Sequence, residues 1–143
     1  MFIGEYTHNL DQKGRLAIPV KFRAQLGEGA FITRGLDQCL FVYATKDWEV
    51  LAEKLNQLPI SQANSRAFAR LMLAGAMAVD LDVQGRILVP DYLRAYSGLK
   101  KKAVVAGLYG RIEIWDDEKW TAYKNNAERQ SDEIAEKMGE LGI

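Results

Sequence analysis

Apolar residues in this chain fall into short runs separated by turn residues, a pattern typical of β-strands. Two of these runs, 16–18 and 87–89, end at Pro19 and Pro90. Proline cannot donate to a β-ladder but is favoured in the first turn of a helix, so each proline predicts a strand-to-helix junction. The strands that we expect are 2–10, 16–18, 30–34, 39–43, 87–89, 103–106 and 112–115.

Two short helices are predicted directly after the prolines, over 20–26 and 91–96. Helices of about two turns are not stable alone in water, so both must dock on a sheet. The side chains that we expect to make this contact are Phe22, Leu26, Leu93 and Tyr96.

Longer apolar stripes at helical spacing predict a pair of helices in the middle of the chain. The first has Thr45 as a good N-cap and ends by Pro59, and the second opens at Ser61 or Asn64. The side chains expected on one face of the second helix are Phe68, Leu71, Met72 and Gly75.

A last helix is predicted near the C-terminus, capped by Asp116 or Asp117 and running towards Met138. Its apolar stripe fades along its length while charged residues increase. We expect this end of the chain to fray or to depend on a partner.

One segment of the chain occurs twice. Asp11–Pro19 reads DQKGRLAIP, and Asp82–Pro90 reads DVQGRILVP, so Asp, Gly, Arg and Pro recur in register about 71 residues apart. The match continues into Phe22-Arg23-Ala24 and Leu93-Arg94-Ala95, and Trp48 corresponds to Trp120. A repeat of this kind predicts an intramolecular pseudo-dimer.

The repeated segment has the chemistry of a tight turn between strands. Gly14 and Gly85 can take the positive φ that such turns often require. Asp11 and Asp82 can accept hydrogen bonds from backbone N–H groups further along the turn.

Each turn ends in an arginine, Arg15 or Arg86, and two interpretations of it stay open at this stage. The guanidinium can form a structural ion pair with its Asp, or it can be presented to a phosphate or a base edge. Both can hold in different states.

Charge is unevenly distributed although the 143-residue chain has a formal net charge of zero. A neutral average can therefore hide a cationic face. Basic residues gather around the repeats, at Lys13, Arg15, Lys21, Arg23, Arg34, Arg86, Arg94, Lys100, Lys101, Lys102 and Arg111. Acidic residues are concentrated after Arg111. We interpret Lys100–Lys102 as a solvated loop, with contact to nucleic acid as the alternative.

Residues for catalysis or metal binding are scarce. His8 is the one histidine and Cys39 the one cysteine, and there is neither a Walker loop nor a G-x-G-x-x-G motif. We therefore expect no enzyme, no cofactor, no metal site and no small-molecule substrate. No apolar run approaches the roughly 20 residues of a membrane span, and the N-terminus lacks a basic region. We expect a cytoplasmic protein without a signal peptide.

On the two turn motifs, the opening Met1-Phe2-x-Gly4 and the paired Trp residues, the chain resembles the MraZ family of bacterial transcriptional regulators. The resemblance implies an α+β fold, namely a pseudo-dimeric double-psi or swapped-hairpin AbrB-like β-barrel with flanking helices. The organisation that we expect is a first AbrB-like repeat at 1–50, a helical linker at 51–76, a second repeat at 77–120 and an acidic C-terminal helix or tail at 121–143.

The resemblance also implies a function. It implies a ring-shaped homo-oligomer on the nucleoid that binds repeated DNA boxes upstream of the division and cell-wall gene cluster, commonly as a repressor. Lys13 and Arg15 match the motif to which DNA contact is assigned, and Arg86 is the counterpart in the second repeat. Gln84 stands where the first repeat has Lys13, so the second half is expected to bind less strongly or to serve assembly.

The resulting hypothesis gives each turn arginine a base edge to read, because arginine can bind guanine with two hydrogen bonds. Lys13, Lys21 and Arg23 would hold phosphates. Two rival hypotheses remain. One is an antitoxin-like module that binds a partner protein through the segment from Asp116, and the other is a ring scaffold without nucleic acid.

Overall fold

The fold is built by strands that cross between the two repeats. In chain order the computed structural model, which describes all residues 1–143, contains β1 (Phe2–Asn9), β2 (Arg15–Ala17), α1 (Val20–Leu26), β3 (Ala30–Arg34), β4 (Leu40–Ala44), α2 (Thr45–Asn56), α3 (Ala63–Ala69), the π-helix η1 (Arg70–Ala74), β5 (Met77–Val79), β6 (Arg86–Leu88), α4 (Asp91–Ser97), β7 (Lys102–Tyr109), β8 (Ile112–Asp116), α5 (Asp117–Arg129), α6 (Ser131–Met138) and the 3-10 helix η2 (Gly139–Leu141).

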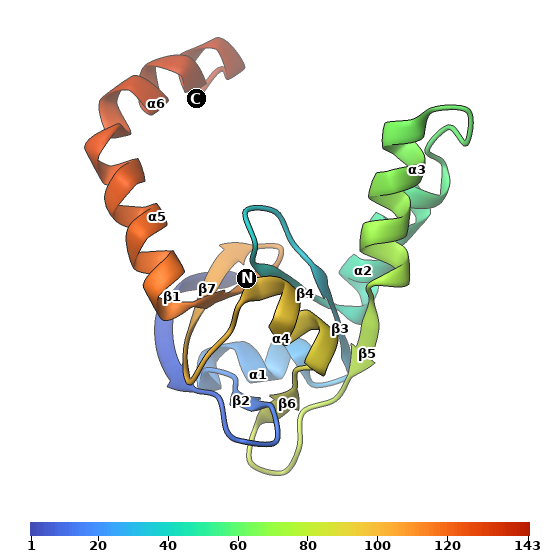
Figure 1. Ribbon diagram of the computed structural model, residues 1–143, viewed down its shortest axis with the longest axis vertical. Helices are drawn as coiled ribbons and strands as arrows, with labels where there is room; N and C mark the ends of the chain where they lie inside the picture. Colours follow the sequence, from blue (N-terminus) through green and yellow to red (C-terminus); the bar gives the residue numbers. More distant parts are fainter.

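The main sheet has six antiparallel strands in the order β1-β7-β8-β4-β3-β5, and β2 pairs with β6 in a separate two-stranded sheet (Figure 1). β1 and β5 open the two repeats, and each pairs with a strand of the other repeat. Read from either end, the order gives the same succession of equivalent strands. The α+β class and the exchanged pseudo-dimer are therefore confirmed, with β1 and β5 left as the two edges of the sheet.

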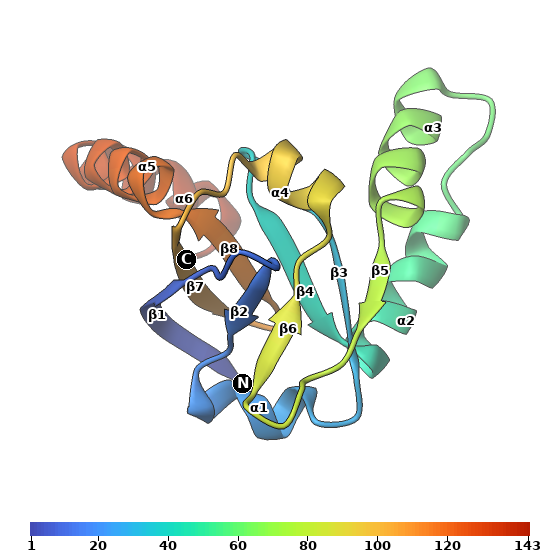
Figure 2. The same ribbon diagram turned by 60° about the horizontal axis from the view of Figure 1, so that its bottom comes forward.

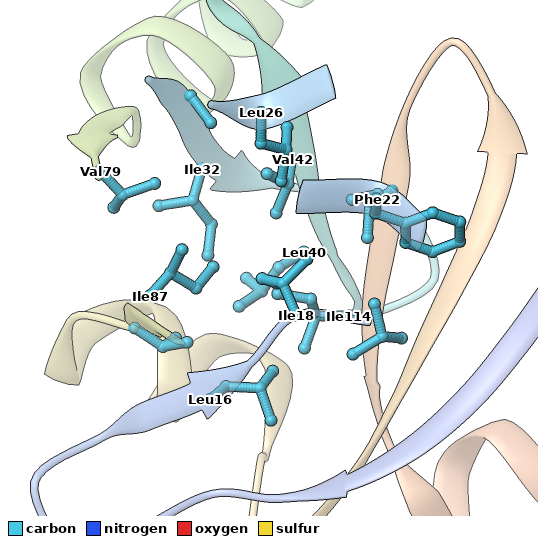
Figure 3. Close-up of a cluster of buried hydrophobic side chains, with 14 of the residues drawn as sticks. Leu16, Ile18, Phe22, Leu26, Ile32, Leu40, Val42, Val79, Ile87 and Ile114 are labelled. Carbon is cyan, nitrogen blue, oxygen red and sulfur yellow. The ribbon is translucent and has the colours of Figure 1, made fainter. Parts of the chain in front are cut away.

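The larger of two apolar clusters, with 17 buried residues, lies between the main sheet, the β2–β6 pair and the short helices (Figure 3). Phe22 and Leu26 of α1 are fully inside it, and Leu93 of α4 is buried in the same core. Phe22 packs edge-on against Phe2 at 5.3 Å between ring centroids. Tyr96 reaches the hairpin of the first repeat and donates its hydroxyl to the Gly35 carbonyl at 2.7 Å. The predicted docking of both short helices is confirmed.

Pro19 and Pro90 stand directly before α1 and α4, as the sequence predicts. The strands before them are shifted by one residue from the expected ranges, to Arg15–Ala17 and Arg86–Leu88. The shift follows from the pairing of the two strands, which begins with Arg15 opposite Leu88 and ends with Ala17 opposite Arg86.

The prediction for the helix after β4 is wrong in its cap. Ala44 is the N-cap of α2, without a side-chain hydrogen bond, and Thr45 is already helical. The strand runs straight into the helix here, and the Thr45 N–H is taken by the Gly29 carbonyl at 3.3 Å. The helix ends at Asn56, three residues before the expected Pro59.

The expected single apolar face of the next helix is also wrong. The helix opens at Ala63 rather than at Ser61 or Asn64, and it changes to a π-helix at Arg70. Of the side chains expected on one buried face, Met72 is 3% exposed, whereas Phe68 and Leu71 are 37% and 48% exposed.

The last helix begins as predicted, since the Asp116 carboxylate caps α5 by accepting the Lys119 N–H at 3.4 Å. It breaks at Gln130 into α5 and α6. The result is two helical arms, α2–α3 and α5–α6, which rise apart from one end of the molecule, while the β1–β2 and β5–β6 loops lie at the other end (Figures 1 and 2). No helix in either arm or elsewhere combines the length and apolar character needed to cross a membrane.

Candidate nucleic-acid interface

The two repeated turns lie side by side at the end of the molecule away from the helical arms (Figure 1). We call Asp11–Arg15 the first turn and Asp82–Arg86 the second turn. The Gly14 carbonyl accepts a hydrogen bond from the Val89 N–H at 2.8 Å, and the Gly85 carbonyl accepts one from the Ile18 N–H at 2.9 Å. Each turn is thus fixed to the strand end of the other repeat.

In the first turn, the Asp11 carboxylate accepts hydrogen bonds from two of the residues that follow it. Its Oδ1 accepts the Lys13 N–H at 3.0 Å and the Arg15 N–H at 2.8 Å. Its Oδ2 accepts the Arg15 Nε at 2.7 Å. The Gly14 N–H donates to the Asp11 carbonyl at 3.0 Å, and Gly14 has a φ of +84°.

The second turn repeats this network almost bond for bond. The Asp82 Oδ1 accepts the Gln84 and Arg86 N–H groups, both at 2.9 Å, and its Oδ2 accepts the Arg86 Nε at 2.9 Å. Gly85 has a φ of +75°. The predicted turn chemistry of Asp and Gly is confirmed in both repeats.

Hydrogen bonds to the charged form lower the pKa of both turn carboxylates. For Asp11 the backbone N–H of Arg15 contributes most, ahead of the arginine side chain, and it keeps the Asp11 pKa below the ordinary 3.8. The backbone N–H of Arg86 does the same to the pKa of Asp82. Both carboxylates are therefore ionised at neutral pH and hold their arginines as ion pairs.

The ion pair still leaves the outer edge of the Arg15 guanidinium available. Asp11 takes the Nε, while neither terminal nitrogen of Arg15 donates a hydrogen bond within the chain, and the side chain is 36% exposed. Arg86 is 27% exposed, and its Nη1 lies 3.8 Å from the Asp11 Oδ2 across the repeat boundary. The structural ion pair is therefore observed for both turn arginines, while their presentation to a phosphate or a base edge stays a prediction.

A second pair of arginines, Arg23 and Arg94, packs against the turns, and this structural contact was not predicted from the sequence. The Arg94 guanidinium lies against Gly14, and the Arg23 guanidinium lies against Gly85, where a Cβ would collide with it. The Arg23 Nε also donates to the Ile18 carbonyl at 2.8 Å. The signal was present, since Arg23 and Arg94 recur at equivalent places in the repeat, but the exchange of partners between repeats is visible only in the fold.

The other residues predicted to contact DNA differ in their exposure to solvent. Lys13 is exposed at the tip of the first turn, Lys21 is exposed on α1, and Arg23 is half-buried against the second turn. Arg23 therefore has a structural contact in addition to any role on DNA.

Charges beside the two turns differ in sign. Next to the first turn, Asn9 pairs with Lys102, and the Leu10 N–H donates to the Lys101 carbonyl at 2.6 Å. The β3–β5 register ends at Ala30 opposite Val79, and its continuation puts Glu28 in the place of Lys101 and Asp80 in the place of Asn9 beside the second turn. Two lysines thus flank the first turn, and two carboxylates flank the second.

The fold contains no cluster of side chains suited to holding a metal ion. No three His, Cys, Asp or Glu side chains are placed to hold a metal ion. Cys39 is fully buried, and burial raises the pKa of its thiol. The largest cavity, of about 510 Å³, lies on the β7–β8 side next to α5. Its Glu113 is already bonded to Arg111 and to the indole N–H of Trp115.

Comparison with known proteins agrees with the twofold construction. A family model described as "MraZ protein, putative antitoxin-like" matches this chain twice, over residues 1–71 and 72–140. The chain belongs to the MraZ family. The two matches of the MraZ model meet inside η1 of the first arm. The narrower boundaries that we expect for the repeats and the helical linker stay a prediction.

Several MraZ relatives are similar to this chain over its whole length. Proteins named "Transcriptional regulator MraZ" from Alkaliphilus metalliredigens, Halothermothrix orenii and Clostridium acetobutylicum are 48%, 49% and 51% identical over 143 residues, which is all of this chain and all of each relative. The family indicated by the two turn motifs, and its regulatory class, are confirmed.

Proposed function

We propose that this chain is a sequence-specific DNA-binding transcriptional regulator that reads duplex DNA with its paired turns. The observation that carries this proposal is the geometry of Arg15. An ionised carboxylate fixes its Nε at 2.7 Å and leaves both terminal nitrogens unbonded on an exposed edge. Arginine presented in this way can donate two hydrogen bonds to guanine O6 and N7, each good pair being worth about 1–3 kcal/mol of discrimination.

The other basic residues divide by exposure into contacts and supports. Lys13 and Lys21 are exposed and would neutralise phosphates, which fixes the register of the protein on the duplex. Arg86 would reach a second base edge, although Asp11 partly holds its Nη1. Arg23 would touch a phosphate only with the part of its guanidinium that does not rest on Gly85.

The first turn is the stronger DNA contact in this proposal. It carries Lys13 where the second turn carries Gln84, and Lys101 and Lys102 lie beside it. Glu28 and Asp80 lie beside the second turn, where they repel a phosphate backbone. Each subunit would therefore bind DNA with a polarity, the first turn leading.

Assembly supplies the affinity that one neutral subunit lacks. We propose a ring-shaped homo-oligomer that places several first turns on repeated boxes, since multivalency can raise affinity by about 10²–10⁴ without new types of contact. The target would be the promoter of the division and cell-wall gene cluster, with repression as the outcome. Such a protein would act in the cytoplasm on the nucleoid and would have no catalytic role.

The proposal is tested by Arg15→Ala on duplex DNA from the region upstream of the gene. We expect a loss of affinity of about tenfold or more in fluorescence anisotropy, because the bidentate contact is removed. The variant should keep its oligomeric state and its circular dichroism spectrum. Arg129→Ala, which removes a guanidinium from the exposed face of α5, is the matched control and should bind like the parent chain.

Salt provides an independent check on the same DNA. Affinity should fall steeply between about 50 and 200 mM salt, because lysines on phosphates release counterions. Unchanged affinity in Arg15→Ala, together with a flat salt response, would contradict DNA reading by the turns and would favour a protein partner.

A further inference from the structure

The helix α6 has an apolar stripe that nothing in its own chain covers. Ile134, Met138 and Leu141 follow one another at the spacing of one helix face, and Ile134 and Leu141 are 41% and 72% exposed. No residue of α6 is buried, and its neighbours are the adjacent segments α5 and η2. Most of the stability of a short helix comes from packing of its apolar face, so the uncovered stripe of α6 is a candidate docking surface.

The same helix is strongly acidic. Its carboxylates, with those of η2, are Asp132, Glu133, Glu136 and Glu140, against the single cation Lys137. None of these four carboxylates forms an ion pair within the chain. A surface that receives α6 must therefore be apolar at its centre and cationic at its edge.

The opposite arm offers such a surface. A groove of about 290 Å³ lies between the end of α2 and the helix α3, with Leu55, Leu58 and Leu73 among its walls. Arg66 and Arg70 stand on its edge one helical turn apart, and neither forms an ion pair within the chain.

Sequence in this arm strengthens the match. No carboxylate occurs between Glu53 and Asp80, so the whole of α3 and η1 is free of negative charge. The groove and its surroundings are thus apolar and positive, where α6 is apolar and negative.

The apolar cavity beside α5, of about 510 Å³, does not fit α6 as well. Glu5 and Glu113 there are already paired with Lys124 and Arg111, and Asp37 is left as a carboxylate without an ion-pair partner. An acidic helix would meet like charge there. Charge therefore distinguishes the two candidate surfaces and favours the α2–α3 groove.

The two arms of one chain cannot satisfy each other. They leave the sheet from opposite sides and diverge, in both views of the fold (Figures 1 and 2). The acidic helix α6 and the basic α2–α3 groove can therefore meet only between two molecules.

We propose that α6 of one subunit docks in the α2–α3 groove of the next subunit. The apolar stripe enters the groove, and carboxylates of α6 pair with Arg66 and Arg70. Two different surfaces meet in this contact, so it repeats from subunit to subunit and closes a ring if the rotation allows. The arms lie away from the turns, so docking leaves the DNA-binding end uncovered (Figure 1). This inference rests on the oligomer in the proposed function and names its contact.

Two full-length variants test the contact, each with one surface disabled. The groove variant carries Arg66→Glu and Arg70→Glu, and the helix variant carries Ile134→Asp and Leu141→Asp. All four side chains lie outside the core, so the fold should be kept. In native mass spectrometry without DNA, we expect the parent chain to form oligomers and each variant alone to be a monomer of about 16.1 kDa.

Mixing the two variants gives the decisive result. The groove variant still has a working α6, and the helix variant still has a working groove, so one contact can form. We expect a one-to-one heterodimer and nothing larger, because each partner has only one functional surface left. The control Lys46→Glu with Lys54→Glu makes the same change of charge on the outer face of α2 and should assemble like the parent.

Three outcomes would overturn the proposal. They are a monomeric parent chain, a variant that assembles alone like the parent, and a mixture that stays monomeric. Assembly that survives in the groove variant but disappears in Leu108→Glu would place the partner on the cavity beside α5 instead. Since these measurements use no DNA, they fail or succeed independently of the Arg15→Ala test.

Discussion

The first and second turns have the same skeleton and different charges. Their carboxylate bonds agree within 0.2 Å, from 2.7–3.0 Å in one to 2.9 Å in the other. The tip of the first turn carries Lys13 and the tip of the second carries Gln84. Lysines lie beside the first turn, and carboxylates lie beside the second. The difference teaches that the fold requires the Asp, the Gly and the packed Arg twice, whereas DNA binding, as proposed, constrains one turn more than the other.

The two helical arms show the same principle on a larger scale. A six-residue connection, Gln57–Gln62, lets α3 return beside α2 and form a groove. A single residue, Gln130, joins α5 to α6, and α6 continues away from the sheet. Of the two equivalent arms, α2–α3 therefore contains a groove, whereas α5–α6 extends away from the rest of the molecule.

The largest effect is expected from substitutions that disrupt the backbone geometry common to both turns. Gly14→Ala and Gly85→Ala each place a Cβ at positive φ and against an arginine of the other repeat. We expect each to lower the free energy of unfolding by about 2–4 kcal/mol, because the backbone is strained and the arginine is displaced from its partners. Urea denaturation measures both, and the two decreases should be similar because the geometry is the same.

Gly110→Ala is the control for these substitutions. Its added Cβ would meet nothing within 4 Å, and its φ is not positive, so we expect a change within about 0.5 kcal/mol. A strong asymmetry between the Gly14 and Gly85 variants would show that the two turns do not support the fold equally.

Local chemistry explains why the turns and the short helices could be predicted from the sequence. Asp11 and Gly14 act within five residues, and Pro19 fixes the start of α1 by its own ring. The burial of Phe22 and Leu26 follows from their helical spacing. Each of these features depends on near neighbours in the chain, and each recurs in the second repeat.

Contacts between distant segments could not be predicted in the same way. Arg94 packs on Gly14 across the repeat boundary, and this requires the exchange of strands to be known. The π turn at Arg70 and the use of Ala44 rather than Thr45 as a cap depend on how a helix meets the sheet. The opposite charges beside the two turns come from strand register, which places Lys101 and Glu28 at equivalent points.

A smaller effect is expected from substitutions that change the charge at the tips of the two turns. Lys13→Gln should weaken DNA binding and reduce the slope of log affinity against log salt by about 0.9 for each phosphate that is no longer neutralised on a single box. Gln84→Lys should increase that slope by a similar amount if the second turn also approaches the backbone. Anisotropy titrations at several salt concentrations measure both variants, with the circular dichroism spectrum as a check on folding.

The exchanged double variant Lys13→Gln with Gln84→Lys separates tip charge from its surroundings. The lysine would now lie beside Glu28 and Asp80 rather than Lys101 and Lys102, so we expect affinity below that of the parent chain. Parental affinity in this double variant would mean that the flanking charges do not matter.

The smallest effect is expected in the pH dependence of stability, through the carboxylates of the two turns. The pKa of Asp11 is lower in the folded chain than the ordinary 3.8, so its stabilisation is complete above that value and disappears as the pH falls through the lowered pKa. Asp11→Asn removes this titration. The difference in unfolding free energy between the parent and Asp11→Asn should therefore be constant near neutral pH and shrink below about pH 4.

Asp82→Asn should follow the same course with a smaller difference at neutral pH, because the Asp11 carboxylate lies near two arginines, Arg15 and, at 3.8 Å, Arg86. Urea denaturation at a series of pH values gives both curves. A gap that widens in acid would mean that the carboxylates do not carry their charge into the folded turns.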